Sequence, residues 1–162
     1  MKTPVYTLWQ PWAGLVIFGG KDIENRHYPP PSKFIGERIA IHAAKTFDQW
    51  FNPPVAPTRE HAIKVYRDIY LNDSSIREML NVRGAILGTV KLEGYLNPRE
   101  GFRVGDLDEI RDAMGMDRYT VNPWWDSEQY GWILSDPKPL KKPIPAKGKQ
   151  GVWYYDLPED EE

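Results

Sequence analysis

Alternating and continuous apolar runs along the chain predict several short strands. Residues 5–9 are rich in β-branched and aromatic side chains, a composition typical of a strand. Between residues 38 and 44 the apolar positions alternate, which places Ile39 and Ile41 on one face of a core strand and His42 on the other. The N-terminal part of the chain therefore supplies two expected strands.

The region 85–93 alternates again and predicts a third strand. Ile86, Val90 and Leu92 are expected on one face, and Gly88 allows a bend or a close approach. The opposite face carries Leu87, Thr89, Lys91 and Glu93. Two further strand candidates stand near the end of the chain, at residues 130–134 and 151–155.

Helical patterns occupy the segments between these strands. A short helix is expected after Pro11 and should end at Gly19-Gly20. A longer helix is expected over 58–71 behind a Thr58 cap, and Ser75 to Glu78 forms a capping-box pattern that opens another. Residues 106–114 complete the helical set. The apolar stripe of the longer helix consists of Ala62, Ile63, Tyr66, Ile69 and Tyr70.

This order of elements predicts an α+β fold. The strands do not alternate with regular crossover helices, so a small β-barrel with flanking helices and one helical insertion, at about 46–81, fits better than a parallel α/β sheet. No internal repeat or linker divides the sequence, so we expect a single domain over 1–162 with an acidic tail at 156–162.

Composition narrows the chemistry available to the protein. The chain has no cysteine, which excludes disulfides, thiolate zinc sites and cysteine nucleophiles. It has neither a signal-peptide pattern nor a long apolar run, and we therefore expect a cytoplasmic protein that does not enter a membrane. The formal charge of −2 argues against tight non-specific binding to duplex nucleic acid, which usually needs a strongly basic surface.

A lysine-rich stretch runs from Lys138 to Lys149 and is interleaved with prolines. Two interpretations stay open for it. The lysines either guide one strand of RNA or protect a sheet edge against pairing with another chain.

The densest polar cluster lies between Gly19 and Arg26. If residues 23–26 are extended, Glu24 and Arg26 project to one face and Lys21 stands at its mouth. A cation, a carboxylate and a guanidinium that converge on a glycine-lined turn can bind, polarise and deprotonate a small polar substrate. The alternative is a solvated loop with a weak surface ion pair.

Several segments together resemble the ASCH domain family. The specific part is the Gly-x-Lys-x-x-Glu-x-Arg signature within Gly19 to Arg26, and the resemblance extends over about residues 5–155. The accompanying segments are Trp9-Gln10-Pro11-Trp12-Ala13, Ile39 to Lys45, Gly84 to Gly88 and Trp132-Ile133-Leu134. This family belongs to the PUA-like superfamily of small β-barrels, so the resemblance implies binding of RNA, modified bases or nucleosides.

Within that family the chain looks most like small single-domain members, which include amidohydrolases that deacylate N(4)-acetylcytidine. In those enzymes a lysine and a threonine of the motif are implicated in catalysis, and so is a glutamate later in the chain. Lys21 matches the lysine, whereas Glu24 replaces the threonine, so we expect Glu24 to act as general base toward water. Lys21 would stabilise the oxyanion or protonate the leaving amine, and Arg26 would hold the pyrimidine or orient Glu24. Glu93 is the candidate for the later glutamate.

Aromatic residues are abundant, with seven tryptophans and nine tyrosines. Such rings either fill the core or sandwich a base, and we predict that Trp12, Tyr28 and Trp132 line the substrate site together with His42. Trp9 and Tyr130 lie beside the same motifs, and Trp124-Trp125 is a candidate lid. The histidines show no metal-ligand spacing, so we predict no metal and no other cofactor.

Three functions follow for testing. The first is an amidohydrolase that acts on N(4)-acylated cytosine nucleosides. The second is a non-catalytic module that binds RNA or a modified base in the same cleft, with single-stranded RNA as its partner. The third is a protein-interaction adaptor that presents the acidic tail.

Overall fold

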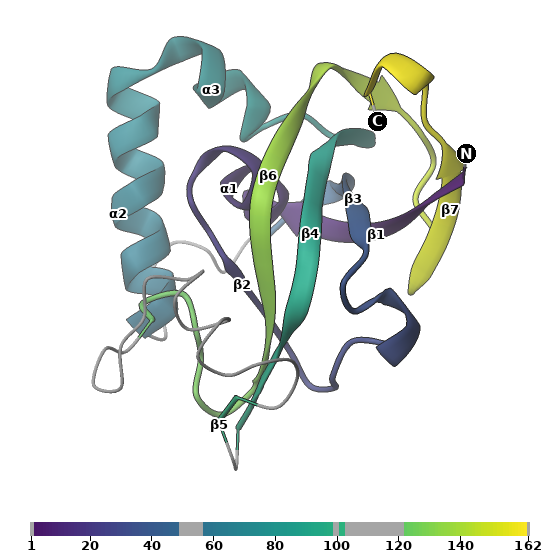
Figure 1. The fold of residues 1–162 in the computed structure, drawn as a ribbon. Coiled ribbons are helices and arrows are strands. Elements are labelled where there is room, and N and C mark those ends of the chain that lie inside the picture. The colour runs from purple at the N-terminus through teal and green to yellow at the C-terminus, as the bar shows by residue number, and fades with distance from the viewer. Residues whose placement is uncertain (1, 49–56, 99–100, 103–121, 162) are drawn as a thin grey trace.

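The computed structural model describes residues 2–48, 57–98, 101–102 and 122–161 (Figure 1). The strands are β1 Lys2–Gln10, β2 Ile23–Arg26, β3 Arg38–Phe47, β4 Ala85–Asn97, β5 Gly101–Phe102, β6 Tyr130–Pro145 and β7 Val152–Asp156. The helices are α1 Trp12–Phe18, α2 Pro57–Asn72 and α3 Ser74–Met79, with 3-10 turns at Ser32–Phe34 and Glu159–Glu161. The five predicted strands and the predicted helices α1 to α3 are confirmed, whereas the helix expected at 106–114 lies outside the described residues.

The strands form one mixed sheet in the order β2-β6-β4-β3-β1-β7, and β5 pairs with β4. β1 and β3 are parallel, and the other pairs are antiparallel. Strands and helices are thus both present without a regular crossover pattern, which agrees with the predicted α+β class.

The sheet is open, which corrects the prediction of a closed barrel. Closure requires each strand to pair on both sides. β2 and β7 stand at the two ends of the strand order, and no ladder joins them within the described backbone. β2 has four residues that pair with β6, and β7 has five that pair with β1. Each of these two short end strands pairs with a longer strand on one side alone. The sheet therefore curves without closing.

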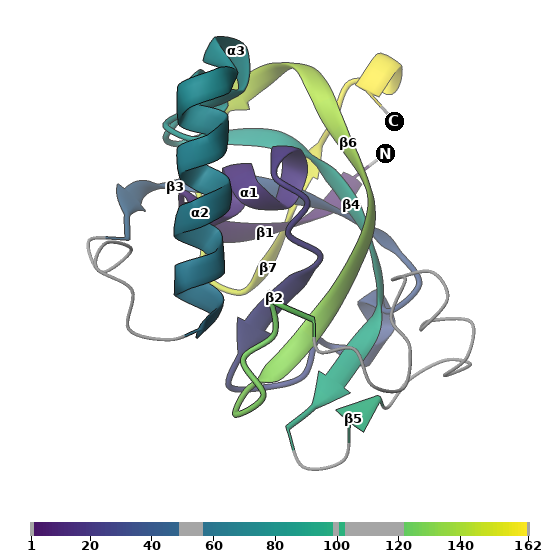
Figure 2. The ribbon, with the colours of Figure 1, turned by 90° about the vertical axis from the view of Figure 1, so that its left-hand side faces the viewer.

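Helix α1 fills the concave side of this sheet. It contacts β1, β3, β4 and β6, and Figures 1 and 2 show it inside the curve of the strands. The buried side chain of Ile17 packs with Leu8, Ile41, Leu92 and other strand residues in the main core. Burial of an apolar side chain of this size contributes about 1.5–3 kcal/mol. The helix is thereby fixed against the strands, and with it the turn that follows.

Helices α2 and α3 cover the outer side of α1 (Figure 2). Ala62 and Ile63 of α2 are buried in a second cluster with Leu15 and Leu80, whereas Tyr70 of the predicted stripe is 44% exposed. The cap of α3 also differs from the predicted Ser75 capping box. Asp73 is the N-cap, because its Oδ1 accepts from the backbone N–H of Ile76 and from Ser75 Oγ.

A bulge in β4 changes the predicted facing of its residues. Ile86 belongs to a separate cluster with Val5 and Leu140, whereas Val90 packs in the main core together with Leu87. The pairing registers of β4 with β6 and of β3 with β4 both shift next to Ile86. Because an extra residue in a ladder inverts the alternation, Ile86 and Val90 do not share one face as the simple period predicted.

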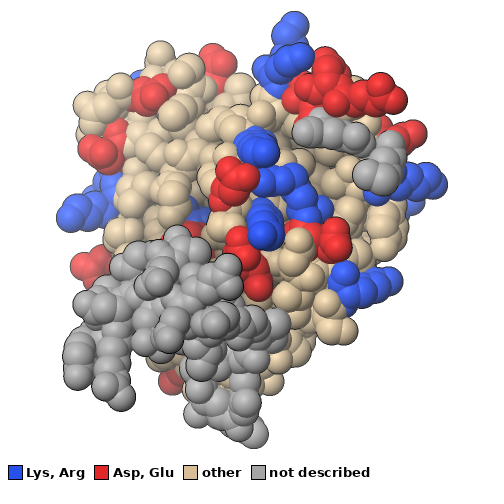
Figure 3. All heavy atoms as spheres, in the orientation of Figure 1, with Lys and Arg blue, Asp and Glu red and all other residues tan. Residues whose placement is uncertain are grey.

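The lysine-rich stretch covers the second half of β6 and the loop after it, and it is partly neutralised by acidic residues. Lys138 pairs with Asp136 at 3.7 Å, and Lys141 pairs with Asp160 of the acidic tail at 3.0 Å. The carboxylate of Glu161 also accepts from the backbone N–H of Lys141. Figure 3 shows cations and anions interspersed on this side. The tail therefore covers one backbone N–H at an edge position of β6.

In the described part of the chain, no helix has the length and apolar character needed to cross a membrane.

Candidate active site

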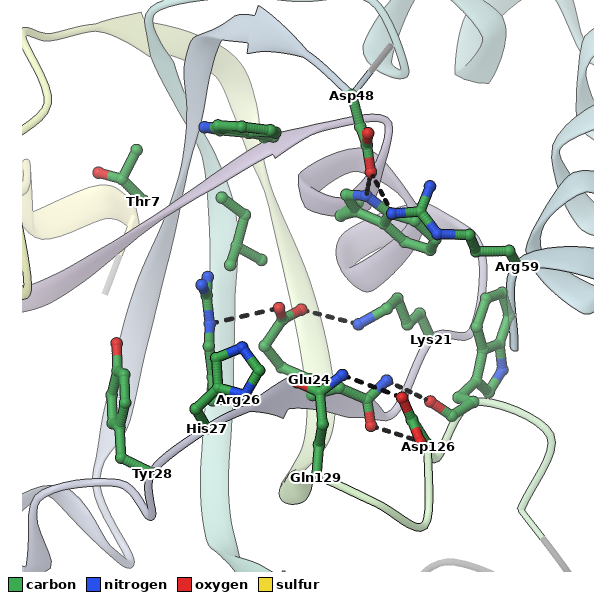
Figure 4. A pocket seen from close by; sticks show the side chains of 15 residues that line it. Thr7, Lys21, Glu24, Arg26, His27, Tyr28, Asp48, Arg59, Asp126 and Gln129 are labelled. Carbon is green, nitrogen blue, oxygen red and sulfur yellow. Dashed lines mark hydrogen bonds and ion pairs between the residues drawn. The ribbon is translucent and has the colours of Figure 1, made fainter. Parts of the chain in front are cut away.

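A pocket of about 530 Å³ lies where α1 gives way to β2 (Figure 4). Its walls come from β1, α1, β2, the end of β3, the first turn of α2 and the segment 124–129. The lining residues are Thr7, Leu8, Trp9, Trp12, Lys21, Glu24, Asn25, Arg26, His27, Tyr28, Asp48, Arg59, Trp124, Asp126 and Gln129. The pocket thus brings together five of the eight predicted site residues, namely Lys21, Glu24, Arg26, Trp12 and Tyr28.

The turn after α1 determines where Lys21 and Glu24 lie. Gly20 has a φ of +73°, a left-handed conformation that glycine adopts without steric cost, and the N–H of Lys21 then bonds back to the helix at Leu15. β2 is extended and pairs with β6, so Glu24 faces the pocket while the intervening Ile23 is fully buried in the second cluster. Glu24 and Arg26 both line the pocket, as their predicted common face requires, and Asn25, which the alternation placed on the opposite face, lines it as well.

Lys21 and Glu24 form a direct ion pair, with Lys21 Nζ 2.7 Å from Glu24 Oε2. Their side chains are 3% and 12% exposed. Lys21 Nζ also donates to the carbonyl of Ile23 and lies 5.7 Å from the centre of the Trp12 ring. An ammonium has three N–H donors, and these two hydrogen bonds use two of them. With respect to the part of the chain that the structure describes, one donor remains for a ligand in the pocket.

Arg26 continues the same row of charges. Its Nε lies 3.5 Å from Glu24 Oε1, and its guanidinium stacks over Tyr6 at 4.9 Å. The Tyr6 hydroxyl shares a 2.9 Å hydrogen bond with Tyr28, and burial raises the pKa of Tyr6 far above its usual value. Tyr6 is therefore a neutral support for Arg26, and Glu24 is held from both sides by cations.

A second ion pair, absent from the sequence prediction, stands above the first. Asp48 Oδ2 accepts from Trp12 Nε1 at 3.0 Å and pairs with Arg59 at 3.1 Å. The Arg59 guanidinium also lies 5.8 Å from the Trp12 ring. Asp48 follows β3 and Arg59 lies in the first turn of α2, so only the folded chain brings them to Trp12. No pattern in the sequence indicates this meeting.

The segment 124–129 forms the opposite wall through a polar network. The side chain of Asn25 donates to the carbonyl of Trp124 and accepts from the N–H of Asp126, both at 2.9 Å. Gln129 Nε2 donates to Asp126 Oδ2 at 3.0 Å. Trp124 is 6% exposed and packs edge-on against His61, so it is a fixed wall residue, in contrast to the predicted lid.

A partly buried hydrogen bond anchors this wall. Asn122 Nδ2 donates to Asp22 Oδ1 at 2.9 Å, and Asn122 Oδ1 accepts from the N–H of Trp124. Burial raises the pKa of Asp22, and the hydrogen bond from Asn122 opposes that rise. Asp22 therefore links the signature loop to the segment that lies across the pocket from it.

Glu93 does not reach this pocket, in contrast to its predicted role as a third catalytic group. Its Oε1 accepts from Ser135 Oγ at 2.6 Å and lies 3.7 Å from Lys91 Nζ. These contacts belong to the β4–β6 face outside the pocket lining. Strand alternation correctly indicated a polar face, but it could not indicate on which side of the sheet the pocket lies.

His42 and Trp132 are buried supports instead of pocket-lining residues. His42 is 2% exposed, and its ring contacts Thr7 Oγ1 at 3.2 Å and the carbonyl of Ala146 at 2.7 Å. Burial lowers the pKa of His42. Trp132 is 1% exposed, and its Nε1 donates to the carbonyl of Tyr28 at 3.0 Å. Both residues therefore hold the wall from behind, which differs from the predicted contact with substrate.

The pocket combines balanced charge with aromatic surface. Within the residues that the structure describes, its lining holds three cations, Lys21, Arg26 and Arg59, and three carboxylates, Glu24, Asp48 and Asp126. Trp9 and Tyr28 also line it and are about half exposed, at 51% and 49%. Such a pocket suits a neutral, flat, polar ligand. Among the described residues, no group of three histidines or carboxylates is arranged to hold a metal ion.

No protein-family model matches the chain. Among the solved structures that are similar to it are two single-substitution variants of the ZmASCH protein from Zymomonas mobilis. One is 17% identical with a TM-score of 0.44, and the match covers 99% of this chain and 94% of that chain. The other is 18% identical with a TM-score of 0.43, and the match covers 98% and 90%. These comparisons indicate no function for the chain, so the evidence for a function comes from the side chains of the pocket.

Proposed function

We propose that the protein is an amidohydrolase that removes the acyl group from N(4)-acylated cytosine nucleosides. The observation that carries the proposal is the 2.7 Å contact between Lys21 Nζ and Glu24 Oε2 at the edge of an aromatic-walled pocket. A carboxylate base and a cationic donor next to one another are the two groups that water attack on an amide carbonyl requires.

In the first step, Glu24 takes a proton from a water molecule while the water oxygen attacks the acyl carbonyl carbon. The carbonyl π electrons move to oxygen, and the remaining N–H donor of Lys21 stabilises the oxyanion. Arg26, 3.5 Å from the other carboxylate oxygen, keeps Glu24 oriented toward the pocket. The roles of Lys21, Glu24 and Arg26 in this step are thus compatible with the contacts that each of them makes.

In the second step, the tetrahedral intermediate collapses. The bond between the carbonyl carbon and N4 breaks, and N4 takes up the proton that Glu24 removed from water. The products are the free carboxylic acid and the cytosine nucleoside. No oxidant, cofactor or second substrate enters this balance, because water supplies both the hydroxyl of the acid and the hydrogen of the amine.

The rest of the pocket suits the nucleoside part of this substrate. A volume of about 530 Å³ lies within the usual range for small-molecule sites. Equal numbers of cations and carboxylates favour a ligand without net charge, such as an acylated cytosine. The rings of Trp9 and Tyr28 offer flat surfaces to a base.

The half-exposed rings of Trp9 and Tyr28 also favour a second candidate, a non-catalytic module that reads RNA or a modified base in the same cleft. Turnover separates the two. Incubation of the protein with N(4)-acetylcytidine, followed by chromatography, should yield cytidine and acetate in equal amounts. Binding of the nucleoside without either product would contradict the hydrolase and favour the reader.

A further inference from the structure

A second basin adjoins the proposed active site. It has a volume of about 470 Å³ and shares Thr7, Trp9, Arg26 and Tyr28 with the pocket already described. Its other lining residues are Tyr6, Lys149, Gln150 and Gly151. The two spaces therefore lie next to one another, with these four residues lining both.

The two spaces differ in charge. The active-site pocket is balanced, whereas the second basin is lined by the cations Arg26 and Lys149 and by no carboxylate among its described residues. The raised pKa of Tyr6 keeps that phenol uncharged at neutral pH. A space with cations only, next to a neutral base site, suits an anionic substituent of the same ligand.

Arg26 stands at the junction of the two spaces. In Figure 4 its guanidinium lies on the side of Glu24 opposite to Lys21. Only its Nε approaches Glu24, at 3.5 Å, and about 30% of the side chain is exposed. A guanidinium carries five N–H donors in a planar fork that matches phosphate oxygens. Arg26 can therefore hold Glu24 through one edge and an anion through the other.

The loop that carries Lys149 is fixed to the sheet behind it. His42 Nε2 contacts the carbonyl of Ala146 at 2.7 Å, and the N–H of Ala146 bonds to the carbonyl of Gly84 at 3.0 Å. A Cβ added at Gly148 would lie 2.8 Å from the His42 ring, so the backbone runs directly over the imidazole. Lys149 thus projects from a backbone that the buried His42 supports.

We propose that the second basin binds a phosphate group attached to the ribose of the acylated cytosine nucleoside, with Arg26 and Lys149 as its cationic contacts. This inference rests on the proposed function for the identity of the base. The phosphate is either a terminal 5′ or 3′ monoester or the diester that joins a neighbouring nucleotide. In the last case, the exposed ring of Trp9 offers a stacking surface to the next base.

Equilibrium binding to the full chain distinguishes these sources. Titration calorimetry would compare N(4)-acetylcytidine, its 5′- and 3′-monophosphates, and dinucleotides with the acylated cytidine on either side. The Glu24→Gln variant prevents consumption of the ligands. We expect at least one phosphorylated ligand to bind about 10-fold more tightly than the nucleoside, as two exposed ion pairs allow. Its advantage should shrink at high salt.

Variants of single lysines test the contact itself. Lys149→Ala should remove most of the affinity advantage of the phosphorylated ligand and leave the affinity for the nucleoside within about twofold. Lys142 is exposed and lies outside both linings, so Lys142→Ala should preserve the advantage. Equal affinity for all ligands in the protein that retains Lys149 would overturn the phosphate site. An equal loss of affinity for nucleoside and nucleotide in Lys149→Ala would overturn it as well.

Hydrolysis of the same ligands by the wild-type protein tests the phosphate site and the amidohydrolase separately. Hydrolysis without a phosphate preference would remove the second basin as a phosphate site and leave the amidohydrolase in place. A Lys149-dependent phosphate preference without hydrolysis of any ligand would support the basin and refute the amidohydrolase.

Discussion

Lys21 Nζ lies 2.7 Å from Glu24 Oε2, and the two side chains form one largely buried unit beside the pocket. A helix end at Gly19-Gly20 and a short extended strand are sufficient to create this contact. Because both charges are shielded from water, each depends on the other for its solvation. The pair therefore bears on stability as well as on the proposed chemistry.

The stability of this pair can be measured with a double-mutant cycle. Lys21→Met and Glu24→Gln should each lower the free energy of unfolding by about 1–3 kcal/mol, because each leaves a buried polar partner unsatisfied. The double variant should lose less than the sum by about 0.5–3 kcal/mol. Urea unfolding of the four proteins gives these values, and strictly additive losses would show that the contact contributes nothing.

Direct attack by water predicts a specific isotope pattern. If Glu24 acts as a base, repeated turnover in oxygen-18 water labels the released acid and leaves the protein unlabelled. If Glu24 instead attacks the acyl group and forms an anhydride, attack of water on the Glu24 carbonyl of that anhydride breaks its bond to the bridging oxygen and places oxygen-18 in the Glu24 carboxylate. Mass spectrometry of the peptide that contains Glu24 detects this route, and a labelled peptide would contradict the proposed mechanism.

His42 should make folding stability sensitive to mild acid. Burial lowers the pKa of His42 below the ordinary histidine value of 6.5. The unfolded chain therefore binds a proton as the pH falls through 6.5, while the folded chain does not, so the contribution of His42 to stability is complete above 6.5 and declines below it. Wild type should accordingly lose more stability than His42→Gln between about pH 7.5 and about pH 5.

Comparison of wild type with His42→Gln removes the effect of other titrating groups on the pH dependence of stability. The raised pKa of Asp22 acts in the opposite direction, since the folded state then holds its proton to higher pH, but this contribution is common to both proteins. Parallel curves of unfolding free energy against pH would contradict the prediction for His42.

Gly88 is required by a close approach of β4 to its neighbours. A Cβ at this position would lie 2.6 Å from the carbonyl oxygen of Lys138 and 3.0 Å from Ile17 Cγ2. Gly88→Ala should therefore destabilise the protein by about 1–3 kcal/mol through backbone displacement. Lys91→Ala, an exposed position on the same strand, should change stability by no more than about 0.5 kcal/mol. Similar unfolding midpoints for the two variants would refute this reading.

The sequence contained enough local information to predict most elements. Alternation at Ile39 and Ile41 identified β3, and the glycines after Phe18 identified the end of α1. The extended reading of Ile23 to Arg26 placed Glu24 and Arg26 on one face, and both line the pocket. These features depend on residues close together in sequence, for which periodicity is a reliable guide.

Features that depend on distant segments could not be predicted in this way. Asp48 and Arg59 reach Trp12 only because α2 packs beside α1, and Asn25 meets Asp126 across about 100 residues of chain. The bulge near Ile86 and the open ends of the sheet likewise follow from pairing between strands. Glu93 was assigned by face alone, and its strand face proved to lie away from the pocket.

The most direct test of the central claim compares Glu24 with Glu93 in steady-state hydrolysis of N(4)-acetylcytidine. Glu24→Gln should lower kcat by at least about 100-fold while the KM changes little, because it removes the base and preserves the shape of the pocket. Glu93→Gln should retain wild-type kcat, since its carboxylate bonds to Ser135 outside the pocket. Wild-type kcat in Glu24→Gln would contradict the account.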